Sequence, residues 1–183
     1  MLSQDLKGKL THVCKGNVEA LLRGEFKLQG TNGMKPNGVW LSWNGGWEDW
    51  CSSEQPDWLE NRPILSVTLK PDLNIFLIDS LEDFQKVFDE FSKLPVAKTK
   101  MHELIDSYKS AGLDASSPTN SAVRSFTLAP DFWKWVREKF DGVAVSNRGQ
   151  WETRFPTFMY GWDCESVCIH NPKNVIFTKQ IVR

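Results

Sequence analysis

The residue types that carry most enzyme chemistry are sparse in this chain. Its three histidines are His12, His102 and His170. His102 lies in a polar segment typical of a solvated surface, and His170 precedes an Asn-Pro turn, where a structural or surface role is favoured. His12 stands beside Leu10 and Val13 in an expected strand, so a buried core histidine is its simplest interpretation. The chain has no GxxxxGK[ST], GxGxxG, GxSxG or HExxH motif, which excludes the usual nucleotide, hydrolase and zinc-protease signatures.

Tryptophans are the second feature with chemical potential. The chain has nine of them, and large rings of this kind mostly build cores. Trp40, Trp43, Trp47 and Trp50 differ from the others because an Asn-Gly-Gly sequence at residues 44–46 interrupts them. This pattern predicts a strand, a loop and a short helix, with some of the rings facing a cleft.

The elements that must position these side chains follow from periodicity and from turn residues. Expected strands cover residues 10–14, 38–42, 64–69, 74–78, 143–146, 165–170 and 174–182, and expected helices cover residues 18–23, 46–52, 80–91 and 131–140, with a further turn or two at 104–108. Asn17 and Ser80 are expected N-caps, and Pro130 suits the first position of a helix. Residues 111–125 are rich in Ser, Asn and Pro and predict a loop.

Strands and helices without regular βαβ alternation predict an α+β fold. A turn at Pro71-Asp72 indicates a hairpin between residues 64–69 and 74–78. A length of 183 residues, with no internal repeat or linker, predicts a single domain spanning residues 1–183.

Charge and composition exclude several classes of protein. The chain has 22 basic and 23 acidic residues and a net charge of −1, which argues against a non-specific nucleic-acid binder. Its mean hydropathy is −0.40, and no apolar run approaches the roughly 20 residues of a membrane span. The first ten residues have no apolar signal-peptide core, and the four cysteines lack zinc-ligand spacing. We therefore expect free thiols, no metal, no membrane association and a cytoplasmic location.

Four segments then occur in an informative order. They are Leu10-Thr-His12 with its following helix and Gly24, then Gly38-Val-Trp40-Leu-Ser42, then Phe140-Asp-Gly-Val143, and finally the run from Glu165 to Val175. Together they resemble the ADP-ribosyltransferase superfamily, in the branch of diphtheria-type toxins and poly(ADP-ribose) polymerases and among its compact bacterial or phage members. The resemblance spans nearly the whole chain and implies a split β-sheet core with flanking helices.

The resemblance implies a catalytic set of Glu165, His12 and Trp40. In this family a strand-opening glutamate stabilises the positive charge that develops on the ribose as the nicotinamide leaves, and a fixed carboxylate suits that task. The histidine holds a ribose hydroxyl, and an aromatic ring on the second strand stacks on the nicotinamide. Trp40 stands where the family has a tyrosine.

The same resemblance implies that NAD is bound by His12, Val13, Trp40, Ser42 and Trp50. Val13 stands where the family has a glycine whose backbone holds the nicotinamide amide. Ser42, or a residue of the helix over residues 47–53, is expected to hold the carboxamide. Trp40 and Trp50 would form the two walls of an aromatic sandwich around the ring.

Three residues are expected to position the target. Asp163 comes two residues before Glu165, in a pattern similar to the acidic pair of the arginine-modifying branch. Arg148 and Arg154 lie in residues 146–158, where family members have a target-recognition loop. These arginines are interspersed with aromatic residues, and such a segment could bind either nucleic-acid bases or an acidic protein surface.

The implied activity is that of an NAD-dependent mono-ADP-ribosyltransferase that modifies a macromolecular acceptor, either a protein or a nucleic acid. A toxin, an effector or a phage protein acting in the host cytoplasm fits this class. Two alternatives stay open. One is a catalytically silent module of the same fold that binds a nucleotide, RNA or protein, and the other is an NAD glycohydrolase that transfers ADP-ribose to water.

Overall fold

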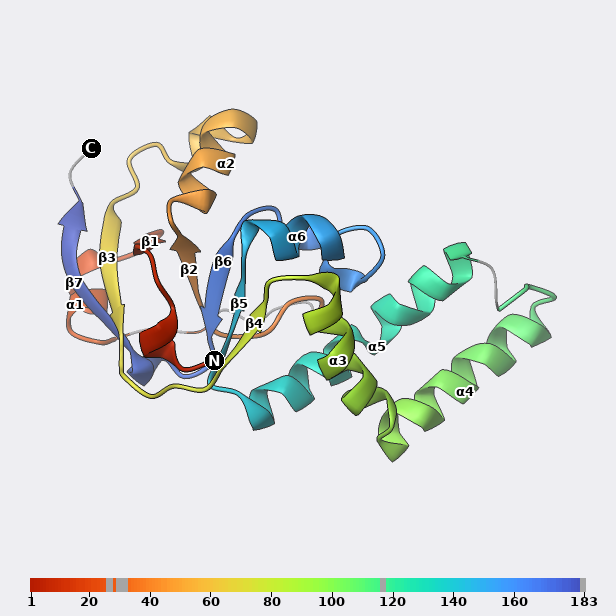
Figure 1. The fold of residues 1–183 in the computed structure, drawn as a ribbon. Coiled ribbons are helices and arrows are strands. Elements are labelled where there is room, and N and C mark those ends of the chain that lie inside the picture. The colour runs from red at the N-terminus through yellow and green to blue at the C-terminus, as the bar shows by residue number, and fades with distance from the viewer. Residues whose placement is uncertain (26–27, 29–32, 116–117, 182–183) are drawn as a thin grey trace.

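Segments rich in β-branched, aliphatic and aromatic residues form the strands of the computed structural model, which describes residues 1–25, 28, 33–115 and 118–181. The strands are β1 (Leu10–Val13), β2 (Val39–Trp43), β3 (Ile64–Leu69), β4 (Ile75–Ile78), β5 (Gly142–Val145), β6 (Ser166–Ile169) and β7 (Val175–Ile181). They form one seven-stranded sheet in the order β4-β5-β6-β2-β1-β3-β7 (Figure 1). The α+β character is therefore confirmed, although hydrogen bonds join all the described strands in one continuous order where the resemblance predicts a split sheet.

The helices begin where the sequence supplies capping side chains. They are α1 (Val18–Leu22), α2 (Gly46–Glu54), α3 (Leu81–Ser92), α4 (Pro95–Ser110), α5 (Pro118–Lys139) and α6 (Asn147–Thr153), with 3-10 turns η1 (Ser3–Asp5), η2 (Pro56–Trp58), η3 (Phe158–Gly161) and η4 (Pro172–Asn174). The Asn17 side chain accepts a hydrogen bond from the backbone N–H of Ala20, and Ser80 accepts one from Asp83. Both predicted N-caps are confirmed.

The predicted hairpin between residues 64–69 and 74–78 is wrong. β3 pairs with β1 on one edge and with β7 on the other, so neither edge is left for β4. β4 instead pairs in parallel with β5. Its other edge meets the N-terminus, where the backbone of Ile75 exchanges hydrogen bonds with Met1 over 2.8 and 2.9 Å.

The predicted loop over residues 111–125 and the predicted helix start at Pro130 are also wrong. α5 already begins at Pro118 and continues through Pro130, while residues 116–117 lie outside the described part of the chain. Leu128, Phe132 and Val136 form a buried stripe on this helix. Their packing outweighs the roughly 3 kcal/mol by which an internal proline disfavours a helix.

Two further helices exceed what the sequence pattern predicts. α4 covers sixteen residues, where the sequence predicts only a turn or two at 104–108. The sequence underpredicts this helix because most of its residues are exposed and its apolar pattern is weak. α6 lies within residues 146–158, which were predicted as a loop, and its N-cap is Ser146, whose hydroxyl accepts from Gly149 N–H. Gly149 packs directly on the carbonyl of Ile78, where a Cβ would come within 2.0 Å of the oxygen.

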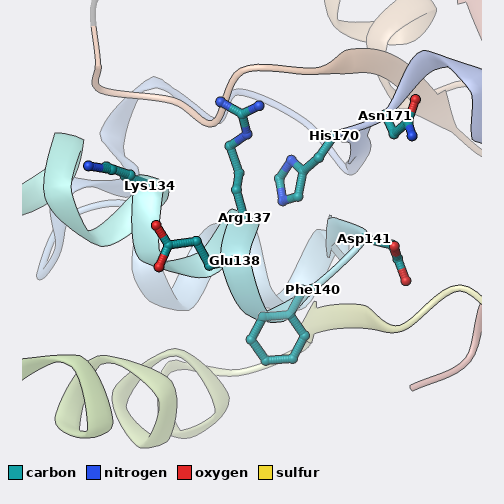
Figure 2. A pocket seen from close by; sticks show the side chains of 7 residues that line it. All are labelled: Lys134, Arg137, Glu138, Phe140, Asp141, His170 and Asn171. Carbon is teal, nitrogen blue, oxygen red and sulfur yellow. The ribbon is translucent and has the colours of Figure 1, made fainter.

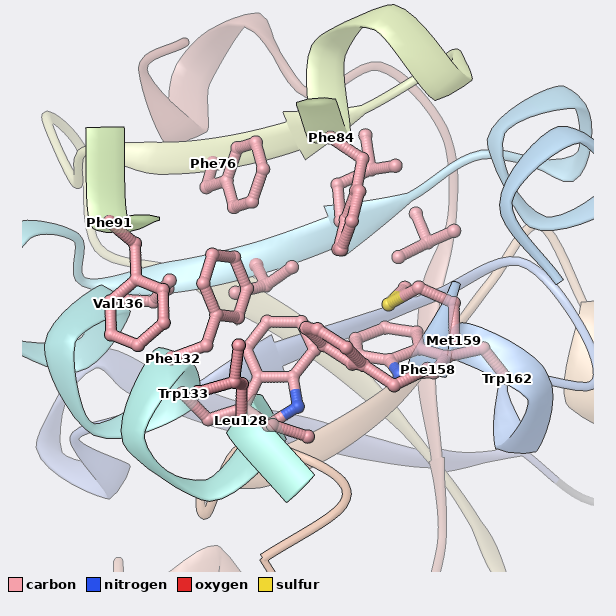
Figure 3. Close-up of a cluster of buried hydrophobic side chains, with 14 of the residues drawn as sticks. Phe76, Phe84, Phe91, Leu128, Phe132, Trp133, Val136, Phe158, Met159 and Trp162 are labelled. Atoms are coloured by element: carbon pink, nitrogen blue, oxygen red, sulfur yellow. The ribbon is translucent and has the colours of Figure 1, made fainter. Parts of the chain in front are cut away.

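The sheet carries one hydrophobic cluster on each face. The first packs α3 and α5 against β4 and β5 and is rich in aromatic rings (Figure 3). The second is aliphatic and contains Val39, Leu41, Leu65, Val167 and Phe177, with α1 packed against it. Successive residues of β2 contribute to different clusters, Val39 and Leu41 to the second and Trp40 to the first, because successive side chains of a strand point to opposite faces.

Candidate active site

The three strands that carry the predicted catalytic residues are immediate neighbours, since β2 lies between β1 and β6. Thr11 of β1 pairs with Ser42 of β2, and Ser42 pairs with Ser166 of β6. At the end of this ladder the backbone N–H of Trp43 donates to the carbonyl of Glu165 over 3.4 Å. The fold thereby brings the residue before β6 next to the end of β2.

The Glu165 side chain lies beside the first residues of α2 and α6 and is half-buried. A Cβ at Gly46 would lie 2.8 Å from its Cγ, so the backbone of α2 approaches it closely. Burial is the largest effect on this carboxyl and raises its pKa, and the nearby charge of Asp49 adds to the rise. Hydrogen bonds from the side chain of Asn44 and the backbone of Asn147 lower the pKa in part.

The turn between β2 and α2 positions one of these donors. Asn44 and Gly45 both have left-handed backbone conformations, with φ of 53° and 86°, and Asn and Gly tolerate that region best. The Asn44 side-chain oxygen accepts from the backbone N–H of Lys9 over 3.1 Å. Its amide nitrogen is therefore the atom that donates to Glu165.

His12 and Trp40 lie on opposite faces of the sheet. The His12 ring packs against Phe177 of the aliphatic cluster at 5.5 Å, whereas Trp40 packs against the aromatic cluster. His12 Nδ1 is 2.9 Å from the carbonyl oxygen of Trp40. Burial lowers the pKa of His12, and this backbone contact offsets part of the effect. From strand spacing, the Cα atoms of His12 and Glu165 are about 12 Å apart.

Ser42 is held by a buried carboxylate that the sequence analysis missed. The Ser42 hydroxyl donates to Glu48, and the Thr11 hydroxyl donates to the other carboxylate oxygen of Glu48 over 2.5 Å. The Ser42 oxygen also accepts from the backbone N–H of Trp47. Glu48 is the third residue of α2, where a glutamate often folds back toward the preceding chain, and that position was the available signal.

We expect Glu48→Ala to destabilise the fold by about 2–4 kcal/mol, because two buried hydroxyls lose their acceptor and each unsatisfied group costs roughly 1–3 kcal/mol. Glu48→Gln keeps one carbonyl acceptor and should lose less. Urea denaturation measures both, with the exposed Glu54→Ala in the same helix as control. Equal losses in Glu48→Ala and Glu54→Ala would show that the buried contacts of Glu48 contribute nothing to stability.

The two tryptophans expected to enclose the nicotinamide belong to different ring clusters. Trp40 lies edge-on to Trp162, with ring centroids 4.7 Å apart. Trp50 stacks on Trp47 at 5.1 Å and 18°, and Trp58 of η2 lies 5.8 and 5.9 Å from these two rings. Trp47 and Trp50 are both half-buried on α2, the helix that borders Glu165.

Of the remaining predicted site residues, Arg154, Asp163 and Arg148 form ion pairs, and Val13 lies on a strand. Arg154 and Asp163 pair with each other at 3.1 Å and are both largely buried. Arg148 pairs with Asp79 at 2.6 Å and is more exposed. Val13 is half-buried at the end of β1. The structure therefore joins Arg154 to Asp163, two residues before Glu165, whereas Arg148 braces the end of β4.

Three exposed aromatic side chains lie on α6 and on the segment that follows it, up to η3. Trp151, Phe155 and Tyr160, called here the aromatic patch, are 63%, 69% and 54% exposed. The Arg154 guanidinium lies 5.3 Å from the Tyr160 ring centroid and 6.0 Å from that of Phe155. Exposed aromatic side chains beside a cation are typical of surfaces that bind another molecule.

His170 is a buried residue at the far end of β6. It is 7% exposed. Burial first, and then the charge of Arg137, lower the pKa of its imidazole to about 4, while the Asn37 backbone and Asp141 oppose the shift. Of the structural and surface roles favoured from the sequence, this burial excludes the surface role.

We expect His170 to make stability decrease on acidification. Because the folded pKa of about 4 lies below the unfolded value of about 6.5, the unfolded chain binds more protons between these values, and stability falls as the pH falls through that window. The loss should reach about 2 kcal/mol by pH 5 relative to pH 7. Denaturation of wild type and His170→Asn at both pH values measures it, with the exposed His102→Asn as control. Parallel pH profiles for wild type and His170→Asn would contradict the expectation.

Comparison with known proteins gives no relative: no family model, curated protein or solved structure matches the chain. Within the described residues, no helix has both the length and the apolar character needed to cross a membrane. The same part of the chain has no cluster of three His, Cys, Asp or Glu side chains that could hold a metal ion.

Proposed function

We propose that the chain is an NAD-dependent mono-ADP-ribosyltransferase with an ADP-ribosyltransferase-like core, in which Glu165 is the catalytic carboxylate. The observation that carries the proposal is the adjacency of β1, β2 and β6, since β1 carries His12, β2 carries Trp40 and Glu165 directly precedes β6. Further support comes from the hydrogen bonds of Asn44 and Asn147, which hold the Glu165 carboxylate at a strand end bordered by two helices.

The reaction breaks the bond between the ribose C1′ and the nicotinamide nitrogen. Nicotinamide leaves with the bonding electron pair, and positive charge develops on the ribose. The Glu165 carboxylate stabilises that charge, and a nucleophile of the acceptor then attacks C1′ and releases a proton. A pre-positioned anion is effective here because it needs no reorganisation as the charge forms.

The residues near Glu165 fit NAD in part. The tryptophans Trp47 and Trp50 offer ring surface on α2, the helix whose first residue approaches Glu165, and such a surface suits a flat nicotinamide. Ser42 is engaged with Glu48, and Trp40 packs against Trp162. We therefore assign the nicotinamide contact to Trp50, and a ribose contact to His12.

The aromatic patch supports a macromolecular acceptor, since its rings and Arg154 suit stacking on bases or contact with a protein surface. The activity would then be that of an effector acting on a host macromolecule.

A second candidate, a silent module of the same fold, is favoured by a specific observation. The groups that would hold the carboxamide and one ring face, Ser42 and Trp40, are already engaged within the protein. Such a module would bind a nucleotide, RNA or protein without turnover.

Nicotinamide release from NAD by the purified chain, with and without cell lysate, tests the proposal. We expect release that lysate stimulates, together with label from adenine-labelled NAD on a macromolecule. Release unaffected by lysate indicates an NAD glycohydrolase. No release under either condition contradicts the enzymatic proposal, and binding of ADP-ribose without turnover would then favour the silent module.

A further inference from the structure

A cavity lies at the opposite end of β6 from Glu165. It has a volume of about 400 Å³ and is lined by residues of the last turns of α5 and of the segment after β6, namely Lys134, Arg137, Glu138, Phe140, Asp141, His170 and Asn171 (Figure 2). This volume lies within the range of small-molecule sites. Glu165 precedes the four residues of β6 and His170 follows them, so the two sites are about 16 Å apart along the strand.

His170 contributes a buried polar group to this cavity with its hydrogen-bonding capacity unused. The residue is 7% exposed, and neither ring nitrogen makes a hydrogen bond of good geometry. The Asn37 backbone lies near the ring and offsets only part of the lowering of its pKa. Buried polar atoms are nearly always hydrogen-bonded, so such an imidazole indicates a partner that the protein itself does not supply.

Arg137 supplies a cation next to this imidazole. In Figure 2 the Arg137 side chain lies next to the His170 ring, and its charge lowers the pKa of His170. Among the described residues Arg137 forms no ion pair. A guanidinium offers several N–H donors in a plane, and it binds phosphate with two of them at once.

The acidic side chains of the lining do not neutralise this pair. Asp141 accepts a hydrogen bond from the backbone N–H of Asn74 over 2.9 Å. In Figure 2 the carboxylates of Glu138 and Asp141 point to opposite sides, away from Arg137 and His170. The space between guanidinium and imidazole therefore presents donors to a ligand.

We propose that this cavity, called here the Arg137–His170 pocket, binds a phosphate group, either free or carried by a small organic molecule. Arg137 donates two hydrogen bonds to the phosphate oxygens, and an imidazole N–H of His170 donates a third. Lys134 also lines the cavity, but its ammonium points away from this pair in Figure 2. The pocket is separate from the proposed NAD site, and its occupancy does not depend on ADP-ribosyl transfer.

Histidine ring NMR tests this directly, because the chain has three histidines and single variants assign each signal. The probes are inorganic phosphate, methyl phosphate and acetate at constant ionic strength. We expect phosphate to shift the His170 signals saturably, to leave His102 unchanged, and to raise the pKa of His170, because the anion favours the imidazolium. A stronger response to methyl phosphate than to phosphate assigns the pocket to an organic phosphate, and the reverse assigns it to the free anion.

The variants separate the pocket from a general charge effect. Arg137→Gln should weaken phosphate binding about tenfold or more, as expected for the loss of charged hydrogen bonds. Arg23→Gln removes the same charge from an exposed position directly after α1 and should leave binding unchanged. Because Arg137 is exposed, its variant should fold normally, and circular dichroism checks that it does. Equal binding by both variants, acetate binding as tight as phosphate binding, or no saturable shift of His170 would each overturn the proposal.

Discussion

Glu165→Gln should lower the rate of nicotinamide release by about 100- to 1,000-fold, the range observed when one group that stabilises transition-state charge is removed. The amide has nearly the same shape and can still accept from Asn44, but it carries no negative charge toward the ribose. The loss should fall on kcat more than on KM, because the charge forms only in the transition state. Steady-state assays of NAD cleavage measure both parameters.

The pH profile gives an independent readout of the same residue. Burial raises the pKa of Glu165, and only the ionised form can stabilise the ribose cation. Activity should therefore fall on acidification at a pH above the usual glutamate range of about 4.3. In Glu165→Gln the remaining activity should not show this fall on acidification, called here the acid limb of the profile. Glu54→Gln, an exposed change in α2, should keep both the rate and the limb, and an unchanged rate in Glu165→Gln would rule out the proposed mechanism.

Phe132→Ala should destabilise the fold by about 3–5 kcal/mol, the usual range for removing a buried phenyl ring. Phe132 is fully buried at the centre of the aromatic cluster (Figure 3). Its ring centroid lies 4.9 Å from that of Trp133, 5.3 Å from that of Phe158 and 5.5 Å from that of Phe91. The alanine leaves a cavity that α3 and α5 share, and this loss is a large part of a typical stability of about 5–15 kcal/mol.

Chemical denaturation of Phe132→Ala measures the change, with Phe155→Ala as the matched control. Phe155 is 69% exposed, so its removal should change stability by no more than about 0.5 kcal/mol. Phe155→Ala should instead weaken acceptor modification if the aromatic patch contacts the target. A loss below about 1 kcal/mol in Phe132→Ala would mean that the cluster repacks around the missing ring.

Local signals in the sequence were sufficient to predict most of the helices and strands. Asn17 and Ser80 begin helices because their side chains satisfy backbone N–H groups within a few residues. The alternation at Ile64–Leu69 and the apolar stretch at Ile75–Ile78 determine strands for a similar local reason. Such interactions join residues near in sequence and can be recognised without knowledge of the fold.

Strand pairing could not be predicted from such local interactions. The edge of β4 pairs with Met1, and both edges of β3 are occupied by distant strands, so a short connection did not become a hairpin. Pro130 continues α5 because the helix packs along the aromatic cluster, a tertiary gain that no local preference contains.

For the candidate site, the sequence by itself determined that His12 and Trp40 lie on strands and that Glu165 lies at the start of a late strand segment, and the order of these residues suggested a testable chemistry. Only the tertiary structure decided that His12 and Trp40 face opposite sides of the sheet. It also decided that Glu48 holds Ser42 and that His170 meets Arg137. Register, burial and the approach of distant side chains depend on how the whole chain packs, and no short segment encodes them.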